Sequence, residues 1–277
     1  MSNSGNILSS WQEYDITVLR AVPANNWSGD ESVPELTPPV AVWKFESGAL
    51  YDDSMGKQGD WYRYNETWPE AVADSDCMEG ASSLLSNYYN DLGSELLQIN
   101  YANVSADFPS KVTTNVGSVC FWMKLHTVPL LDVFDEYCYF GAPGFSAVVM
   151  QDGTNALSAG IDIYKAAGGT DAIYTGEIIQ LDRWYHVGIA WDADNCRVRV
   201  WGETEQAIME DKYAARTGSM LVRETPLYLK VTNPTHHEGE VESKLLTTNR
   251  IDELVAFNRV ISVAEIDAIR QQQWPPT

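Results

Sequence analysis

The sequence predicts an all-β fold, an antiparallel β-sandwich of two sheets with one short C-terminal helix. From residue 40 onward, short runs of alternating apolar and polar side chains are separated by turn residues, a spacing typical of sandwiches. Aromatic residues make up 11% of the chain, and these large flat side chains suit pleated, half-buried surfaces better than helix bundles. With 44% hydrophobic residues, a chain of 277 residues can bury enough apolar surface for one large core.

The clearest strand pair is expected at 184–201, with its turn at 192–195. In the second strand Val198 and Val200 alternate with Arg197 and Arg199, so one face is apolar and the other is polar and faces solvent. Further strands are expected at 40–45, 118–124, 227–231 and 250–257.

One helix is expected, over 262–272. Ser262 and Glu265 have the spacing of a capping box, in which the two side chains each bond a free backbone amide at the helix start. Ile266 and Ile269 then give the helix an apolar stripe that can pack on a sheet.

Residues 1–39 differ from the rest of the chain and are interpreted as an N-terminal arm and linker. A strand-like run at 15–22 is followed by an acidic, proline-rich stretch at 28–39 whose adjacent prolines favour an extended backbone. The alternative is that 15–22 joins the edge of the sandwich as a first strand. The expected organisation is therefore an arm at 1–39 and one sandwich with its helix at 40–277.

The charge balance restricts the class of partner. Asp and Glu number 39 against 18 Lys and Arg, a formal net charge of −21 that repels nucleic acid and anionic lipid and favours basic protein surfaces and cations. No apolar run reaches the roughly 20 residues of a membrane span. Residues 1–6 lack the pattern of a secretory signal, so we expect either use without export or a start after a removed signal.

Four segments, in this order, resemble the laminin-G-like (concanavalin A-like lectin/glucanase) jelly-roll family. VWKFESG with the following DSMGK is similar to the family's opening W-x-F-D-x-G and D-x-S-G-N, and SVCFWMK to its F-S-x-S-F-W-V-K strand. WYHVGIAWD resembles its W-H-H-V-A-x-T-Y-D strand, and RIDELVAFNRVISVAEI its closing I-D-E-V-R-I-Y-N-R-A-L-S-x-x-E-I. The resemblance covers about 40–272. It implies the fold, but not the function, because the fold is used by lectins, adhesion modules, glucanases and virion proteins.

The chain departs from the glucanases of this family at their catalytic residues, so we expect that it is not an enzyme. Glucanases of this fold use carboxylates in an E-x-D-x-x-E arrangement, which aims two acids on one strand face at the scissile bond. The strand at 160–164 offers only Asp162, and no G-x-S-x-G or H-E-x-x-H motif is present. A glycoside hydrolase is the least favoured interpretation.

A structural calcium ion is the cofactor that the resemblance implies. Asp53, after the first strand, and Asp252, in the closing segment, match the positions expected for its carboxylate ligands, and they come together if the first and last strands pair. The alternative is that Asp53 makes an Asx-turn and Asp252 bonds backbone amides.

Aromatic residues form a candidate ligand site. If exposed in one patch, they would suit stacking on carbohydrate or contact with protein; the alternative is that they fill the core. The candidates are Trp61, Tyr62, Tyr64 and Trp68. A packing role is expected instead for Trp43, Trp122 and Trp184.

Two function classes follow. The first, which we favour, is a non-enzymatic assembly or adhesive module displayed on a larger particle such as a virion, held to a protein partner there by the arm at 1–39. The second is an extracellular, calcium-assisted carbohydrate-binding module. Neither ligand nor oligomeric state is predicted.

Overall fold

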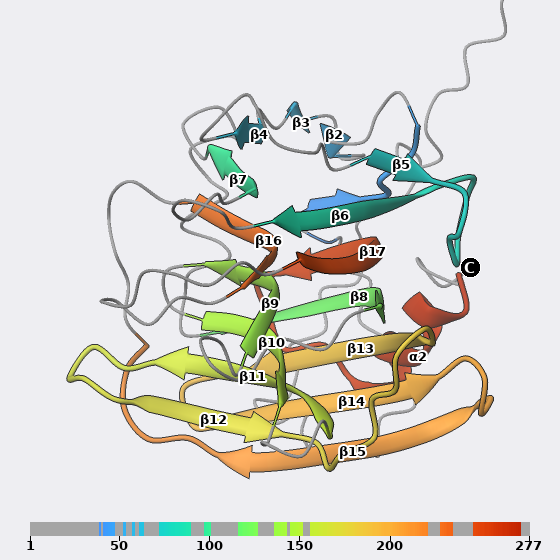
Figure 1. The fold of residues 1–277 in the computed structure, drawn as a ribbon. Coiled ribbons are helices and arrows are strands. Elements are labelled where there is room, and N and C mark those ends of the chain that lie inside the picture. The colour runs from blue at the N-terminus through green and yellow to red at the C-terminus, as the bar shows by residue number, and fades with distance from the viewer. Residues whose placement is uncertain are drawn as a thin grey trace, which may run out of the picture.

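In the computed structural model of the chain, two antiparallel sheets face each other, and the one helix among the described residues lies outside them (Figure 1). The predicted β-sandwich with a short C-terminal helix is thereby confirmed. The structure describes residues 39, 41–47, 52–53, 57–58, 61–63, 72–89, 97–100, 116–126, 136–142, 145–151, 156–220, 228–234 and 246–272. The predicted arm lies almost wholly outside them and stays a prediction, as does the boundary at residue 40.

The larger sheet has ten strands, and its centre is formed by the longest strand, β17. The strand order is β15 (Ala207–Ala215), β14 (Asn195–Gly202), β13 (Trp184–Trp191), β8 (Gly117–Leu125), β17 (Leu246–Phe257), β1 (Ala41–Trp43), β2 (Asp52–Asp53) and β3 (Lys57–Gln58). Two further strands lie off this path: β6 (Ser83–Tyr89) pairs with β17, and β5 (Val72–Asp74) pairs with β6.

The smaller sheet has seven strands. Its order is β12 (Thr170–Tyr174), β11 (Leu157–Tyr164), β10 (Phe145–Gln151), β9 (Glu136–Ala142), β16 (Tyr228–Pro234), β7 (Leu97–Asn100) and β4 (Trp61–Arg63).

The first strand is shorter than the sequence predicts. Alternation over 40–45 suggests six residues, but β1 ends at Trp43. Phe45 has a φ of 54°, in the left-handed region that no strand uses, and its ring is fully buried. The chain therefore turns here so that Phe45 enters the core.

The main core lies between the sheets and is built by the alternation of each strand. On β13, Tyr185, Val187, Ile189 and Trp191 all point inward. From the smaller sheet, Phe145 packs on Trp191 with ring centroids 4.5 Å apart. Within the described residues, no helix is long and apolar enough to cross a membrane.

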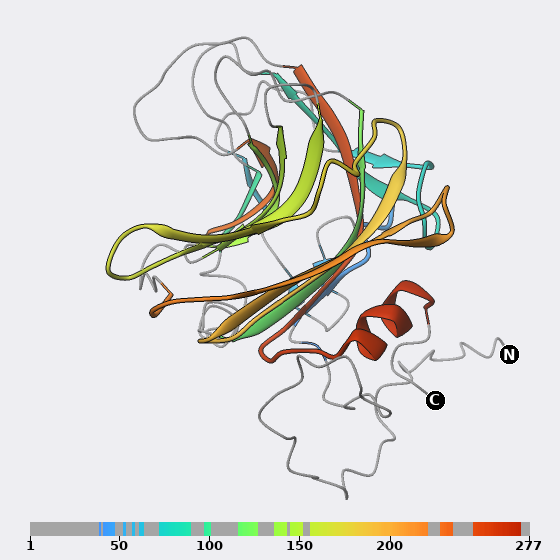
Figure 2. The same cartoon turned by 90° about the horizontal axis from the view of Figure 1, so that it is seen from below.

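The helix α2 (Val263–Arg270) packs on the outer face of the ten-stranded sheet (Figure 2). The predicted capping box is present, because the Ser262 side chain accepts from the Glu265 amide and the Glu265 side chain accepts from the Ser262 amide. Gly188 lets the helix approach closely, since a Cβ there would lie 2.5 Å from Cγ2 of Ile266. A second apolar cluster, which includes Cys120 and Ile266, forms between sheet and helix.

Candidate binding site

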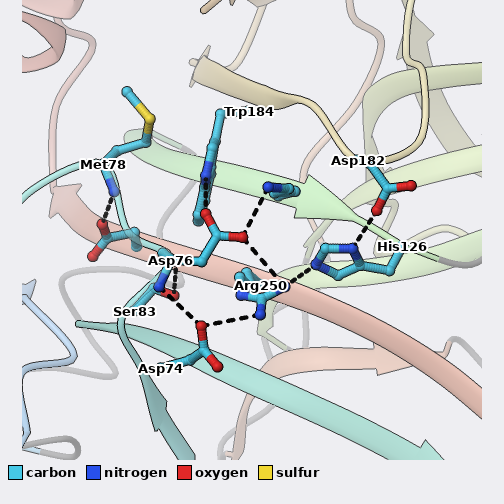
Figure 3. A network of polar contacts seen from close by, with 10 residues as sticks. Asp74, Asp76, Met78, Ser83, His126, Asp182, Trp184 and Arg250 are labelled. Atoms are coloured by element: carbon cyan, nitrogen blue, oxygen red, sulfur yellow. Dashed lines mark hydrogen bonds and ion pairs between the residues drawn. The ribbon is translucent and has the colours of Figure 1, made fainter.

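The outer face of the ten-stranded sheet also carries a polar network beside the helix (Figure 3). Its organiser is the stretch Asp74 to Ser82, which leaves β5 and lies over β8, β13 and β17; we call it the 74–82 segment. Trp122 and Trp184 lie beneath it and are buried, as the sequence predicted for packing residues. The 74–82 segment therefore covers part of the outer face formed by these three strands.

Asp76 joins the segment to two strands. Its Oδ2 accepts from Nζ of Lys124 at 2.8 Å, and its Oδ1 accepts from the indole nitrogen of Trp184 at 3.0 Å. Partial burial alone would raise the pKa of Asp76. The hydrogen bonds from Lys124 and Trp184, with the charges of Lys124 and Arg250, outweigh it and hold that pKa below its usual value. Asp76 is therefore an anion that the fold stabilises.

Arg250 on β17 links the 74–82 segment to His126. Its Nη2 donates to Oδ1 of Asp74 at 3.0 Å, and its Nη1 contacts Nε2 of His126. On the other side of the ring, Nδ1 of His126 lies 2.5 Å from Oδ1 of Asp182. Because a guanidinium only donates, Nε2 must accept, and the ring proton lies on Nδ1 toward Asp182. Asp182 is largely exposed, so the chain of contacts ends at the surface.

Asp252 holds the far end of the segment. Its Oδ2 accepts from the amides of Met78 and Glu79 at 2.8 and 3.0 Å, and its Oδ1 accepts from the Glu253 amide at 3.0 Å. A bulge interrupts the pairing of β17 with β8 between Asp252 and Val255, and Glu253 has a φ of 44°. The irregular backbone thus places a fully buried carboxylate beneath the segment.

Three carboxyls at this end, Glu79, Asp252 and Glu253, form what we call the acidic group. Burial is the main cause that raises the pKa of Glu79 to about 7, against an opposing hydrogen bond from Trp122. Burial and the charge of Glu79 raise the pKa of Asp252 to about 7 and that of Glu253 to about 8. The group therefore titrates near neutral pH.

The predicted calcium ligands lie on strands of the same sheet. Asp53 on β2 pairs with Trp43 on β1, and Trp43 pairs with Leu254 on β17, so the first and last strands do meet as expected. The side chain of Asp53 lies outside the described residues. Within them, no three His, Cys, Asp or Glu side chains are placed to hold a metal ion.

Asp252 makes the amide contacts of the alternative interpretation. Its carboxylate is a hard oxygen donor of the type calcium takes, but calcium needs six to eight oxygens. The described side chains do not by themselves assemble such a set, and the calcium site stays a prediction.

The two predicted aromatic residues that the structure describes, Trp61 and Tyr62, lie on the other sheet from this network. Both residues belong to β4, one of the two outer strands of the seven-stranded sheet, where Trp61 pairs with Ile99 and Tyr62 with Gln98 of β7. Tyr64 and Trp68 lie outside the described residues. Their role in binding stays a prediction.

Sequence reasoning missed most of the polar network. Asp74, Asp76, His126 and Asp182 come from three loops and strand ends with no shared motif, so no spacing could have joined them. One usable signal was Arg250, a cation on a central strand of an acidic protein, which needs carboxylate partners when half-buried.

Comparison with known proteins supports the fold. No known family's sequence profile matches the chain, and no curated protein matches it in sequence. Among solved structures, the binding domain of botulinum neurotoxin serotype C1 is similar with a TM-score of 0.57 and 8% identity, over 86% of this chain and 53% of that one. The binding domain of Paraclostridial Mosquitocidal Protein 1 is similar with a TM-score of 0.55 and 14% identity, over 86% and 53%.

The chain spans about half the length of these structures. A third similar structure is the binding domain of botulinum neurotoxin DC in complex with SialylT, with a TM-score of 0.55 and 9% identity, over 86% of this chain and 51% of that one. At such identities the likeness is one of fold. The laminin-G-like family itself is not shown by these comparisons.

Proposed function

We propose that this chain is a non-enzymatic binding module whose ligand is a carbohydrate. The observation that carries the proposal is the likeness, over 86% of the chain, to binding domains of toxins. One of those domains was solved with SialylT, and another belongs to a toxin whose cell entry depends on two ganglioside molecules. A fold hosts many functions, so the proposal also needs support from this chain's own residues.

Support against a catalytic role comes from the Asp182–His126 pair, the arrangement that most resembles part of a catalytic triad. In a triad, the second imidazole nitrogen accepts the proton of a nucleophile. In this chain that nitrogen already accepts from Arg250. The pair therefore supports Arg250, which bonds Asp74 of the 74–82 segment, and activates no nucleophile.

We place the carbohydrate at the aromatic stretch that begins on β4. Trp61 and Tyr62 lie on one of the two outer strands of the seven-stranded sheet, and Tyr64 and Trp68 follow them in the chain. Aromatic rings at a sheet edge can stack on the apolar faces of sugar rings.

A glycan array probed with the full chain tests this proposal. We expect binding to a defined set of glycans, a loss of at least tenfold in the Trp61→Ala/Tyr62→Ala variant, and retention in Trp61→Phe/Tyr62→Phe, which keeps both rings. Folding of each variant is checked by circular dichroism. Binding to no glycan would overturn the proposal, and so would release of a shortened glycan, which would make the chain a hydrolase.

The finer proposal is that the module is adhesive and is displayed on a larger particle such as a virion. The acidic, proline-rich stretch within 1–39 supports it as a tether to a protein partner. Co-sedimentation of the full chain with capsids or tails, lost on deletion of 1–39 while glycan binding persists, is the expected result. An equal yield without the arm would overturn its role as the tether, and a full chain that does not co-sediment would overturn display on a particle in favour of a free extracellular module.

A further inference from the structure

One border of the ten-stranded sheet, the strand β15, exposes apolar side chains and has no further strand beside it among the described residues. β15 is the last strand in the sheet order, and among the strands that the structure describes it pairs with β14 alone (Figure 1). Within the described residues, the two large hydrophobic side chains that are most exposed, Ile208 at 39% and Tyr213 at 49%, both lie on this one strand. Unpaired strand edges with exposed apolar side chains are surfaces on which another strand can add.

Pairing with β14 shows which side chains of β15 share a face. Glu210 lies opposite Val200, and Lys212 lies opposite Val198. Both valines point into the core, so the side chains of Glu210 and Lys212 lie on the inner face of the sheet. Asp211 falls between them and points to the outer side, as the two-residue alternation of a strand requires.

The charge order along the edge is complementary to itself. When two copies of β15 pair antiparallel about a two-fold axis through Asp211, residues an equal number of positions before and after it face each other. Glu210 of each copy then lies opposite Lys212 of the other, on the same face of the sheet, and two opposite-charge pairs form. An axis through Lys212 instead opposes Lys212 to itself and Glu210 to Ala214. An axis through Glu210 opposes Glu210 to itself and Lys212 to Ile208, so either shift loses both opposite-charge pairs.

Asp211 lies on the axis and would face the Asp211 of the other copy, but its charge is already paired within its own chain. Asp211 is ion-paired with Nε of Arg197 at 3.0 Å and with Nη1 of Arg199 at 2.5 Å, both on β14. Two Asp211 carboxylates across the axis therefore each carry two guanidinium partners from their own chain. That compensation removes the one like-charge contact of this register.

From these observations we infer that β15 is an interface for a second copy of this chain, which pairs through it to give a two-fold dimer with one continuous sheet. A two-fold axis perpendicular to the sheet keeps each outer face on the same side. The dimer thus presents two 74–82 segments, and two copies of any binding site, in one direction, which raises the avidity for a multivalent ligand. The inference does not depend on the identity of the ligand.

Charge-swapped variants test the interface by sedimentation equilibrium at about 0.15 M salt, where the repulsion between two chains of net charge −21 is screened beyond about 8 Å. We expect the wild type to dimerise. Glu210→Lys and Lys212→Glu should each weaken the dimer at least tenfold, although they change the net charge in opposite directions. The double variant, with both changes, restores the pairs and should restore the dimer.

A cysteine on the axis reports the register. Asp211→Cys places two thiols on opposed strand positions about 4.5–5.5 Å apart between Cα atoms, a distance that a disulfide spans. We expect oxidation to cross-link Asp211→Cys and not Tyr213→Cys, with the wild type as control for the native cysteines. A wild type that stays monomeric, a dimer indifferent to both single charge changes, or no cross-link at 211 would overturn the inference.

Discussion

The carboxylate of Asp76 accepts a hydrogen bond from the indole nitrogen of Trp184, 3.0 Å away, although the two residues are 108 positions apart in the chain. The same carboxylate accepts from Lys124 on the neighbouring strand. One side chain thus attaches the 74–82 segment to two strands of the outer face.

Removal of this anchor should loosen the segment more than the fold. A hydrogen bond to a charged group contributes about 1.5–3 kcal/mol, and because Asp76 is 38% exposed we expect Asp76→Ala to lower the free energy of unfolding by only about 1 kcal/mol. Hydrogen exchange at the amides of residues 77–81 should accelerate. Asp76→Asn, which keeps an acceptor for Trp184, should exchange at a rate between those of the wild type and Asp76→Ala. Unchanged exchange in Asp76→Ala would show that the contacts of Asp74 and Asp252 suffice to hold the segment.

The close approach of helix and sheet gives a second prediction. A methyl group at Gly188 would lie 2.5 Å from Ile266, and overpacking of this kind costs about 1–3 kcal/mol. Gly188→Ala should therefore lower the melting temperature. In the Ile266→Ala background the same change should cost less, because the space has been cleared, so the double-mutant cycle is non-additive. Strict additivity would mean that the helix does not pack here.

The acidic group predicts how stability depends on pH. In the unfolded chain such carboxyls titrate near pH 4, whereas the pKa values of Glu79, Asp252 and Glu253 in the folded chain are about 7, 7 and 8. Between these limits the folded state holds more protons, so the free energy of unfolding falls as the pH rises from about 4 to about 8.

Chemical denaturation in EDTA over that pH range measures the slope. Glu253→Gln removes one titrating group and should reduce the dependence of the free energy of unfolding on pH. Glu203→Gln removes a carboxyl outside the acidic group and is the charge-matched control. A slope equal in Glu253→Gln and wild type would exclude Glu253 as its source.

His186 acts in the opposite direction at acidic pH. Its ring is buried against Trp122, with centroids 5.1 Å apart, and its Nε2 has no partner among the described residues. Burial, helped by the charges of Arg270 and Arg199, lowers the pKa of His186 to about 3. Between pH 6.5 and 3 the unfolded state binds more protons, so this residue costs stability as the pH falls through that range.

Replacement of this histidine by an apolar ring should stabilise the protein. We expect His186→Phe to raise the free energy of unfolding by about 1–3 kcal/mol, because it removes an unsatisfied buried group and keeps the ring contact. The difference in the free energy of unfolding between His186→Phe and the wild type should grow as the pH falls below 6.5. A loss of stability at every pH would show that Nε2 has a partner after all.

The calcium site predicted from Asp53 and Asp252 has a direct test in thermal melting. An ion that binds only the folded chain stabilises it by mass action, so we expect calcium to raise the melting temperature and EDTA to reverse the rise. The rise should be absent in Asp252→Asn. If calcium leaves the wild type unchanged, the contacts with the amides of Met78, Glu79 and Glu253 are the whole role of Asp252.

Local patterns of the sequence determined the parts of the fold that depend on neighbouring residues. Alternation identified β13 and β14, and the spacing of Ser262 and Glu265 identified the start of α2, because both signals are contained within a few residues. The turn of the chain at Phe45 was not visible, since a positive φ for an aromatic residue is imposed by burial in a core that distant strands build.

Only the tertiary structure decided how the outer face is organised. Asp76, Lys124, Trp184 and Arg250 come from four separate parts of the chain, and no one of them has a local signal for its partners. The raised pKa of Asp252 likewise follows from burial and from the nearby Glu79, neither of which is visible in the residues that flank it. Sequence specifies such contacts only through the fold, because hydrogen bonds and charges act through space rather than along the chain.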